Sequence, residues 1–116
     1  GDWEQGWIIF ADPTRNSPWT NASVDAGETV ALYSQALSGN VVVKGNNGAS
    51  QYVSYSADGL SRQLNGSSLA AATIRVCSTS TALQDSQRAR DIAINSIGRV
   101  TVSTASSVSS ACAAPT

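Results

Sequence analysis

Arginine is the residue type in this chain best suited to recognise a charged partner. Residues 59–116 carry five Arg against two Asp, whereas residues 1–58 carry six acidic side chains and two basic ones. Guanidinium groups bind carboxylates and phosphates through paired hydrogen bonds. Arg88, Arg90 and Arg99 are therefore candidate contacts for an acidic partner or for phosphates. The alternative is that they cap strand ends and pair with Asp85 or Asp91 at the surface, where ion pairs contribute little.

The residues needed for most catalytic chemistry are missing from the sequence. The chain has no His and no Met, so it holds no Ser-His-Asp or Cys-His unit and no His-ligated metal site. Asp12, Asn16, Asp25 and Glu28 offer oxygen ligands for calcium, but turn and capping roles explain the same residues without a metal. We expect no metal, no cofactor and no enzymatic activity. The net charge of −1 predicts no general attraction to nucleic acid.

The two cysteines suggest a disulfide between a strand and the C-terminal tail. Cys77 follows an alternating apolar run, and Cys112 lies in a Ser/Ala-rich tail. The composition, poor in charge and rich in Ser and Thr, is typical of a secreted domain, in which disulfides persist. A Cys77–Cys112 bridge pins the tail, whereas two free thiols remain the alternative.

The elements that must position these residues are short strands. The length of 116 residues suits one domain. No apolar run is long enough to span a membrane. Apolar alternation and turn residues predict seven or eight antiparallel strands, and the best helical candidate, residues 69–72, is short. The strand-like runs are residues 6–11, 28–37, 40–44, 51–56, 60–62, 73–77, 90–95 and 99–103.

The last two runs predict a hairpin with a defined register. Ile94 opposite Val100 also places Ile92 opposite Val102. A three-residue loop then remains, and Gly98 falls where such a loop needs a left-handed residue.

The aromatic residues gather near the start of the chain. Trp3, Trp7 and Phe10 are predicted to be core side chains, because aromatics bury large areas, with a ligand-stacking platform as the alternative. Trp19, in a polar loop, either plugs the core or is an exposed contact.

Several segments, in order, resemble GspH/FimT-type minor pilins and pseudopilins. Residues 3–12 (WEQGWIIFAD) are similar to the family's W-x-x-G-W-I-x-F-x-D, and residues 25–28 (DAGE) to its D-x-G-E. Residues 52–59 and 75–77 resemble two of its strands. Residues 90–100 are similar to its R-x-I-x-I-N-x-x-G-R-V signature, and Cys112 lies where a terminal Cys is common.

The resemblance implies a fold and a structural role. The fold is a mainly β, sandwich-like head of antiparallel sheets over residues 1–116. Family members carry a leader, a long apolar helix and a first strand ahead of the W-x-x-G-W segment, so we expect the full-length protein to be membrane-anchored by that helix. Without the helix, one sheet face should expose an apolar patch.

The function implied is assembly or priming of a type IV pilus, at or near its tip, through contacts with other minor pilins and the major pilin. The subunit would move from the inner membrane and periplasm to the cell surface. Edge strands and the Arg-bearing hairpin are the expected contacts. One alternative is a type II secretion pseudopilin. The other is a DNA-uptake pilin, although Thr101 replaces the second Arg of the G-R-x-R motif that DNA-binding relatives carry.

Overall fold

A computed structural model of the chain describes residues 1–13, 24–69 and 71–116. The molecule is elongated, with extents of 47 × 27 × 20 Å. Among the described residues, no helix is long and apolar enough to cross a membrane. Asn16 and Trp19 lie outside the described residues, and so does any role predicted for them.

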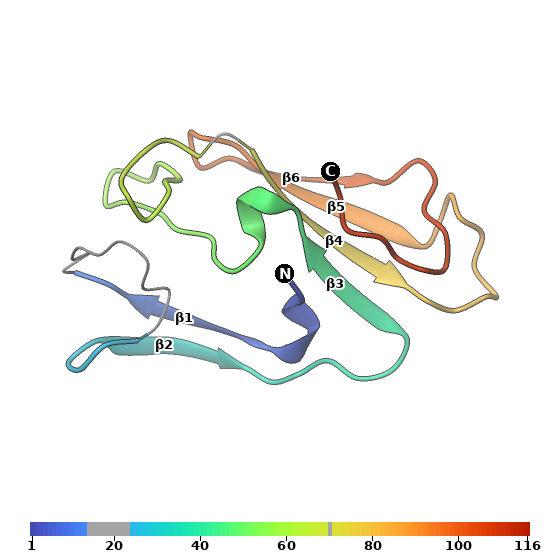
Figure 1. Cartoon of the computed structure of the whole chain (residues 1–116), viewed down its shortest axis with the longest axis horizontal. Helices are drawn as coiled ribbons and strands as arrows, with labels where there is room; N and C mark the ends of the chain where they lie inside the picture. The colour runs from blue at the N-terminus through green and yellow to red at the C-terminus, as the bar shows by residue number, and fades with distance from the viewer. Residues whose placement is uncertain (14–23, 70) are drawn as a thin grey trace.

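Six strands form two antiparallel sheets among the described residues, as the predicted mainly β fold requires (Figure 1). A two-stranded sheet pairs β1 (Trp7–Ala11) with β2 (Thr29–Ser34). A four-stranded sheet has the order β3-β4-β5-β6. Its strands are β3 (Val41–Gly45), β4 (Ala72–Ser78), β5 (Ala89–Ile94) and β6 (Val100–Thr104).

Two short 3-10 turns complete the regular structure of the residues described here. η1 (Trp3–Gln5) precedes β1, and η2 (Asn47–Ala49) follows β3. The Nε1–H of Trp3 donates to the carbonyl of Ala49 at 2.8 Å, so the two turns are joined across the sequence. Gly45 N–H donates to the Gly1 carbonyl at 2.9 Å, and Asp2 bridges to Lys44, so the N-terminal segment covers the outer edge of β3.

The hairpin of β5 and β6 has the register that the sequence predicts. Ile94 pairs with Val100 and Ile92 with Val102. The connecting loop is closed by the Asn95 N–H donating to the Arg99 carbonyl at 3.1 Å. Gly98 has a φ of +81°, the left-handed conformation expected there.

The strand predicted over residues 51–56 is wrong, and the best helical candidate, residues 69–72, shows no helix at the residues described there. Residues 55 and 61 form an isolated bridge, with one backbone hydrogen bond from the Arg62 N–H to the Ser54 carbonyl beside it, and no strand in the described part of the chain forms a ladder with residues 51–54. Tyr52 is held instead through its side chain: its hydroxyl donates to Gln63 Oε1 at 2.8 Å. Ala72 begins β4, so tertiary pairing overrides the weak local preference for helix.

Buried side chains form two small clusters, one on each face of the four-stranded sheet. One contains Cys77, Ala89, Ala105, Val108 and Cys112. The other contains Ala49, Leu69, Ala72 and Ile94. Neither cluster, as far as the chain is described, includes a residue of β1 or β2. The two sheets therefore do not share a closed core.

Candidate interaction surface

An open apolar groove of about 970 Å³ separates β1 from one face of the four-stranded sheet. One wall is β1, through residues 7–10, and the floor includes Ile74, Val76 and Ile92. The segment 50–55 forms another part of the lining. Cross-strand pairing explains the apolar floor, because directly paired residues point to the same face of a sheet. Ile74 pairs with Ile92, and Ile92 with Val102.

The aromatic residues predicted as core lie in this groove. Trp3, Trp7 and Phe10 all line it, and none of them belongs to the buried clusters. Trp7 is 36% exposed and its neighbour Ile9 is 53% exposed. The apolar character read from the sequence is present, but the described residues supply no covering that would make a closed core.

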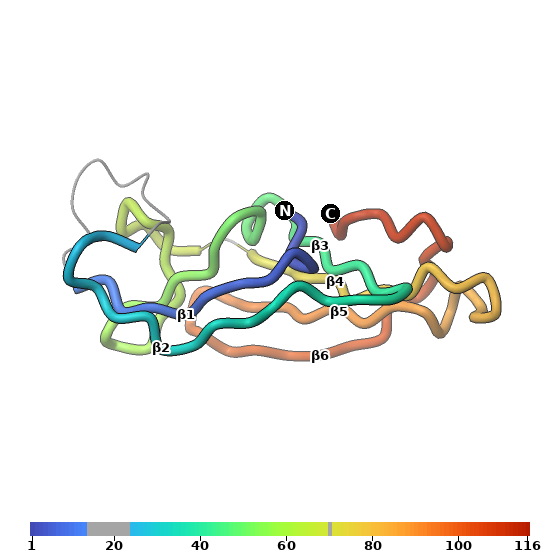
Figure 2. Tube along the Cα trace, turned by 90° about the horizontal axis from the view of Figure 1, so that it is seen from below, coloured from blue at the N-terminus to red at the C-terminus, as the bar shows by residue number. Residues whose placement is uncertain are grey.

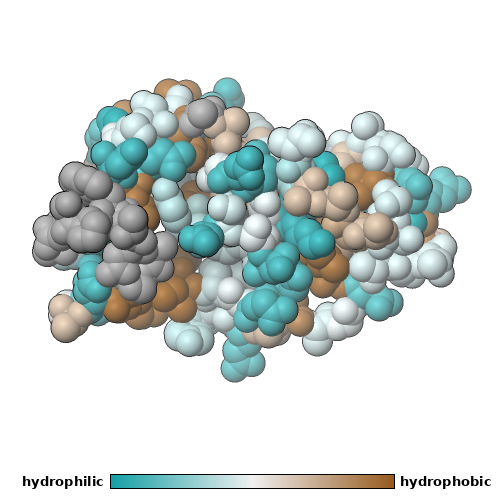
Figure 3. All heavy atoms as spheres, in the orientation of Figure 1, coloured by the Kyte–Doolittle hydropathy of each residue, from teal (hydrophilic) through white to brown (hydrophobic). Residues whose placement is uncertain are grey.

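Exposed apolar side chains continue from the groove onto the small sheet. Val30, Leu32 and Tyr33 of β2 are all exposed. Figure 3 shows hydrophobic atoms gathered over β1 and β2, at the lower left of the view. These exposed apolar side chains and the groove mark a surface suited to a partner.

The opposite face of the sheet is closed by the chain's own tail. The disulfide predicted between Cys77 and Cys112 is present, with the two Cα atoms 5.8 Å apart and a sequence separation of 35. Ala105 and Val108 are buried beside it. The guanidinium of Arg75 lies on this face, where it binds Asp91 through two hydrogen bonds of 2.7 and 2.8 Å.

The Arg75 guanidinium also holds the tail, because its Nη1 donates to the carbonyl of Ala113 at 3.1 Å. The hydrogen bonds to Asp91 raise the pKa of Arg75 above its ordinary value. Partial burial of the guanidinium lowers this pKa, and the negative charge of Asp91 raises it. The tail is thus held by a covalent bond and by a charge-assisted one.

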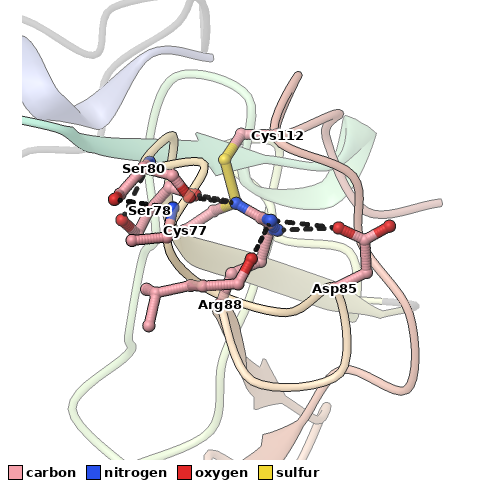
Figure 4. A network of polar contacts seen from close by, with 8 residues as sticks. Cys77, Ser78, Ser80, Asp85, Arg88 and Cys112 are labelled. Atoms are coloured by element: carbon pink, nitrogen blue, oxygen red, sulfur yellow. Dashed lines mark hydrogen bonds and ion pairs between the residues drawn. A yellow bond between two sulfur atoms is a disulfide. The ribbon is translucent and has the colours of Figure 1, made fainter.

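Arg88 is a structural residue of the loop that joins β4 to β5, at 7% exposure (Figure 4). It forms an ion pair with Asp85 at 3.0 Å and donates to the carbonyls of Ser78 and Ser80 at 3.0 and 2.9 Å. It also donates to the carbonyl of Leu83. The sequence suggested that the arginines pair with Asp85 or Asp91, and Arg88 forms the pair with Asp85. These internal contacts use most of the hydrogen-bond donors of the Arg88 guanidinium, so few remain for a partner.

The structure does not gather the three predicted contact arginines. Arg90 lies at the start of β5, exposed, and donates to the carbonyls of Gln87 and Ala89. Arg99 lies beside the hairpin turn at the other end of the same pair of strands and is exposed. Pairing places the Arg90 side chain on the groove face, whereas the parity of β6 places Arg99 on the opposite face.

The predicted oxygen cluster is a turn as far as it is described. Asp25 N–H donates to Glu28 Oε2 at 2.6 Å, and Glu28 N–H donates to the Asp25 carbonyl at 3.1 Å. These bonds are the turn role that the sequence offered as the alternative to calcium.

Another side-chain contact was not predicted from the sequence. The hydroxyl of Ser61, fully buried, donates to the carbonyl of Asn95 and ties the 55–68 segment to the β5–β6 hairpin. A single Ser in a Ser-rich chain gives no signal from which this contact could have been read.

The fold and the groove define a β-sheet domain with one closed face and one uncovered apolar face. The model of the family described as type II transport protein GspH matches residues 1–98. The chain therefore belongs to the GspH family, a family of envelope-associated pseudopilins and pilins. Members are in general structural proteins that interact with other subunits of their complex.

No curated protein and no solved structure matched the chain. The assignment therefore rests on the family match and on the residues that carry it. The match ends at residue 98, so β6 and the bridged tail lie beyond the matched range.

Proposed function

We propose that this chain is the head of a non-enzymatic minor pilin, which takes part in the assembly of a type IV pilus at or near its tip. The subunit passes from the inner membrane and periplasm to the cell surface as the filament forms. The observation that supports this proposal is the apolar groove between β1 and the four-stranded sheet.

The dimensions and chemistry of the groove suit an apolar helix. A helix with its side chains is about 10 Å wide and rises about 5.4 Å per turn, so one turn fills about 420 Å³. The groove of about 970 Å³ thus has room for about two turns. Among the described residues of its lining there is no Lys or Arg, and the acidic side chains there are Asp2 and Asp12. Pilin-type subunits supply such a helix, either from the same chain or from a neighbour.

A second candidate is a pseudopilin of a type II secretion system, which the description of the matching family favours. Both candidates use the same surface. They differ in the cellular process that depends on this surface, which is pilus assembly for the first candidate and protein secretion for the second. One set of variants, scored for both processes, therefore distinguishes the two candidates.

The test is complementation of a deletion strain of the source bacterium. Ile9→Lys places a charge in the groove, and Ile97→Lys is the matched control, because Ile97 is 66% exposed in the hairpin turn and outside the groove lining. We expect Ile9→Lys to abolish complementation and Ile97→Lys to restore it. Loss of surface pili indicates the first candidate, and loss of secreted protein with pili intact indicates the second. Full complementation by Ile9→Lys contradicts both.

DNA uptake stays a prediction that depends on Arg90 and Arg99, since Arg88 is bound internally. Two cations give only weak, salt-dependent affinity. Fluorescence anisotropy with a DNA duplex at low and high salt tests this prediction. Absence of binding at low salt removes it, and Arg99→Ala should abolish any binding that is seen.

A further inference from the structure

We propose that β6 is a docking edge at which a second copy of this chain adds its own β6, antiparallel, to form one continuous sheet. The proposal is independent of the groove, on which the proposed function rests.

The backbone of β6 has a free side. In the hairpin, Asn95 N–H donates to the Arg99 carbonyl and Ala105 N–H donates to the Ala89 carbonyl. The backbone N–H and C=O groups of the odd-numbered residues of β6 therefore point toward β5. An antiparallel ladder alternates, so the N–H and C=O groups of Val100, Val102 and Thr104 point away from β5. In the described part of the chain, no other strand pairs with β6.

This edge lacks the usual protection against pairing. Natural edge strands carry Lys, Pro or a bulge, or are covered by another segment. β6 has the sequence VTVST, it has no irregularity in its register, and all five of its residues are exposed. Figure 2 shows it along the outer margin of the molecule.

The other edges differ from β6. The outer edge of β3 is covered by the N-terminal segment. β2 belongs to a ladder whose register is broken between Ile9 and Phe10. Among the described strands, β6 therefore offers the most regular uncovered edge.

A second copy is the occupant because β6 is complementary to itself. With a two-fold axis at Val102, that residue pairs with the partner's Val102, and Val100 pairs with the partner's Thr104. All three outward-facing residues then exchange hydrogen bonds with the partner strand. The row formed by Ile74, Ile92 and Val102 continues across the axis as an apolar stripe.

The charges permit this pairing. In this register Arg99 lies opposite the partner's Ala105. The two Arg99 side chains are then about 20 Å apart, beyond a screening length of about 10 Å. The net charge of −1 adds little repulsion between copies.

Sedimentation velocity of the disulfide-bonded chain over a concentration series tests the proposal. The interface is one strand wide, so we expect a weak monomer–dimer equilibrium near about 100 µM. Val102→Lys and Val102→Glu each place like charges directly opposite one another, and each should weaken dimerisation by about tenfold or more. Val102 is 66% exposed, so neither change should prevent folding, which circular dichroism checks.

Mixing the two variants is the decisive step. Val102→Lys opposite the partner's Val102→Glu should restore the dimer, because the pair becomes attractive. Leu32→Lys, on the exposed strand β2, is the matched control and should leave the dimer unchanged. A monomer at all concentrations up to about 1 mM overturns the proposal. A dimer that is lost with Leu32→Lys, or that is not restored by mixing, also overturns it.

Discussion

The two faces of the four-stranded sheet are covered in different ways. On one face the chain covers itself: the tail after β6 is pinned by Cys77–Cys112 and by Arg75. At the end of the sheet, Arg88 binds the carbonyls of the loop that joins β4 to β5. On the other face lies the groove, with Trp7 and Ile9 exposed along its wall. The difference separates stability from recognition. We expect changes on the closed face to lower the free energy of unfolding, and changes in the groove to affect binding instead.

The largest expected effect is loss of the disulfide. Cys77→Ala with Cys112→Ala opens a loop of 35 residues, and chain entropy predicts that the free energy of unfolding falls by about 4 kcal/mol. Guanidinium chloride unfolding measures it. Ile9→Ser in the groove is the contrast and should change the free energy of unfolding by less than about 0.5 kcal/mol. Equal losses from the two changes would erase the distinction between the faces.

The next effect concerns Arg88. Arg88→Ala leaves the carbonyls of Ser78, Ser80 and Leu83 without their donor, and we expect a loss of about 2–3 kcal/mol in the free energy of unfolding. Arg99→Ala, at an exposed position, should cost less than about 0.5 kcal/mol. The same denaturation experiment compares them. Similar values for the two would show that Arg88 is not a structural residue.

A smaller effect is expected at the turn between β5 and β6. Gly98→Ala forces an L residue into a φ of +81° and brings its Cβ to 2.1 Å from the Gly59 carbonyl oxygen. The left-handed conformation alone costs about 1–2 kcal/mol. Gly39→Ala is the matched control, since Gly39 has a φ of +84° with open space around it. Thermal unfolding should rank Gly98→Ala as the more damaging, and the reverse order would contradict the close contact.

The smallest effect is the pH dependence of the turn at Asp58. A hydrogen bond from the Ser56 hydroxyl, with the Leu60 N–H and Arg62 adding to it, holds the pKa of Asp58 below its ordinary value. A depressed carboxyl pKa contributes stability that is present above the ordinary pKa and lost as the pH falls through the folded value. Asp58→Asn should therefore flatten the slope of melting temperature between about pH 5 and about pH 2, measured beside the unchanged chain. An identical slope in both would remove this assignment.

Local sequence signals predicted the parts of the fold that depend on local chemistry. The register of the β5–β6 hairpin could be predicted from residues 90–103 alone. The apolar alternation in that segment and the position of Gly98 in the turn require the same pairing. Residues 51–56 were predicted as a strand because their pattern alternates, but a strand forms only where a partner supplies a ladder.

The candidate site was predicted less well than the fold. The Arg residues could be identified, but the loop carbonyls that bind Arg88 are backbone groups, which leave no mark in the sequence. The aromatic cluster near the start of the chain predicted burial, because apolar composition does not reveal what covers a surface. The groove became visible only when β1 and the four-stranded sheet were placed in space.

The central claim is that the groove, and not the face closed by the tail, receives an apolar helix of a pilin-type subunit. Site-specific photo-crosslinking in the source bacterium tests it most directly, with benzoylphenylalanine in place of Ile9 in the groove or of Ala113 on the closed face. We predict that position 9 crosslinks to an apolar helical segment, identified by mass spectrometry, and that position 113 does not. Crosslinks to such a helix from position 113, with none from position 9, would contradict the account.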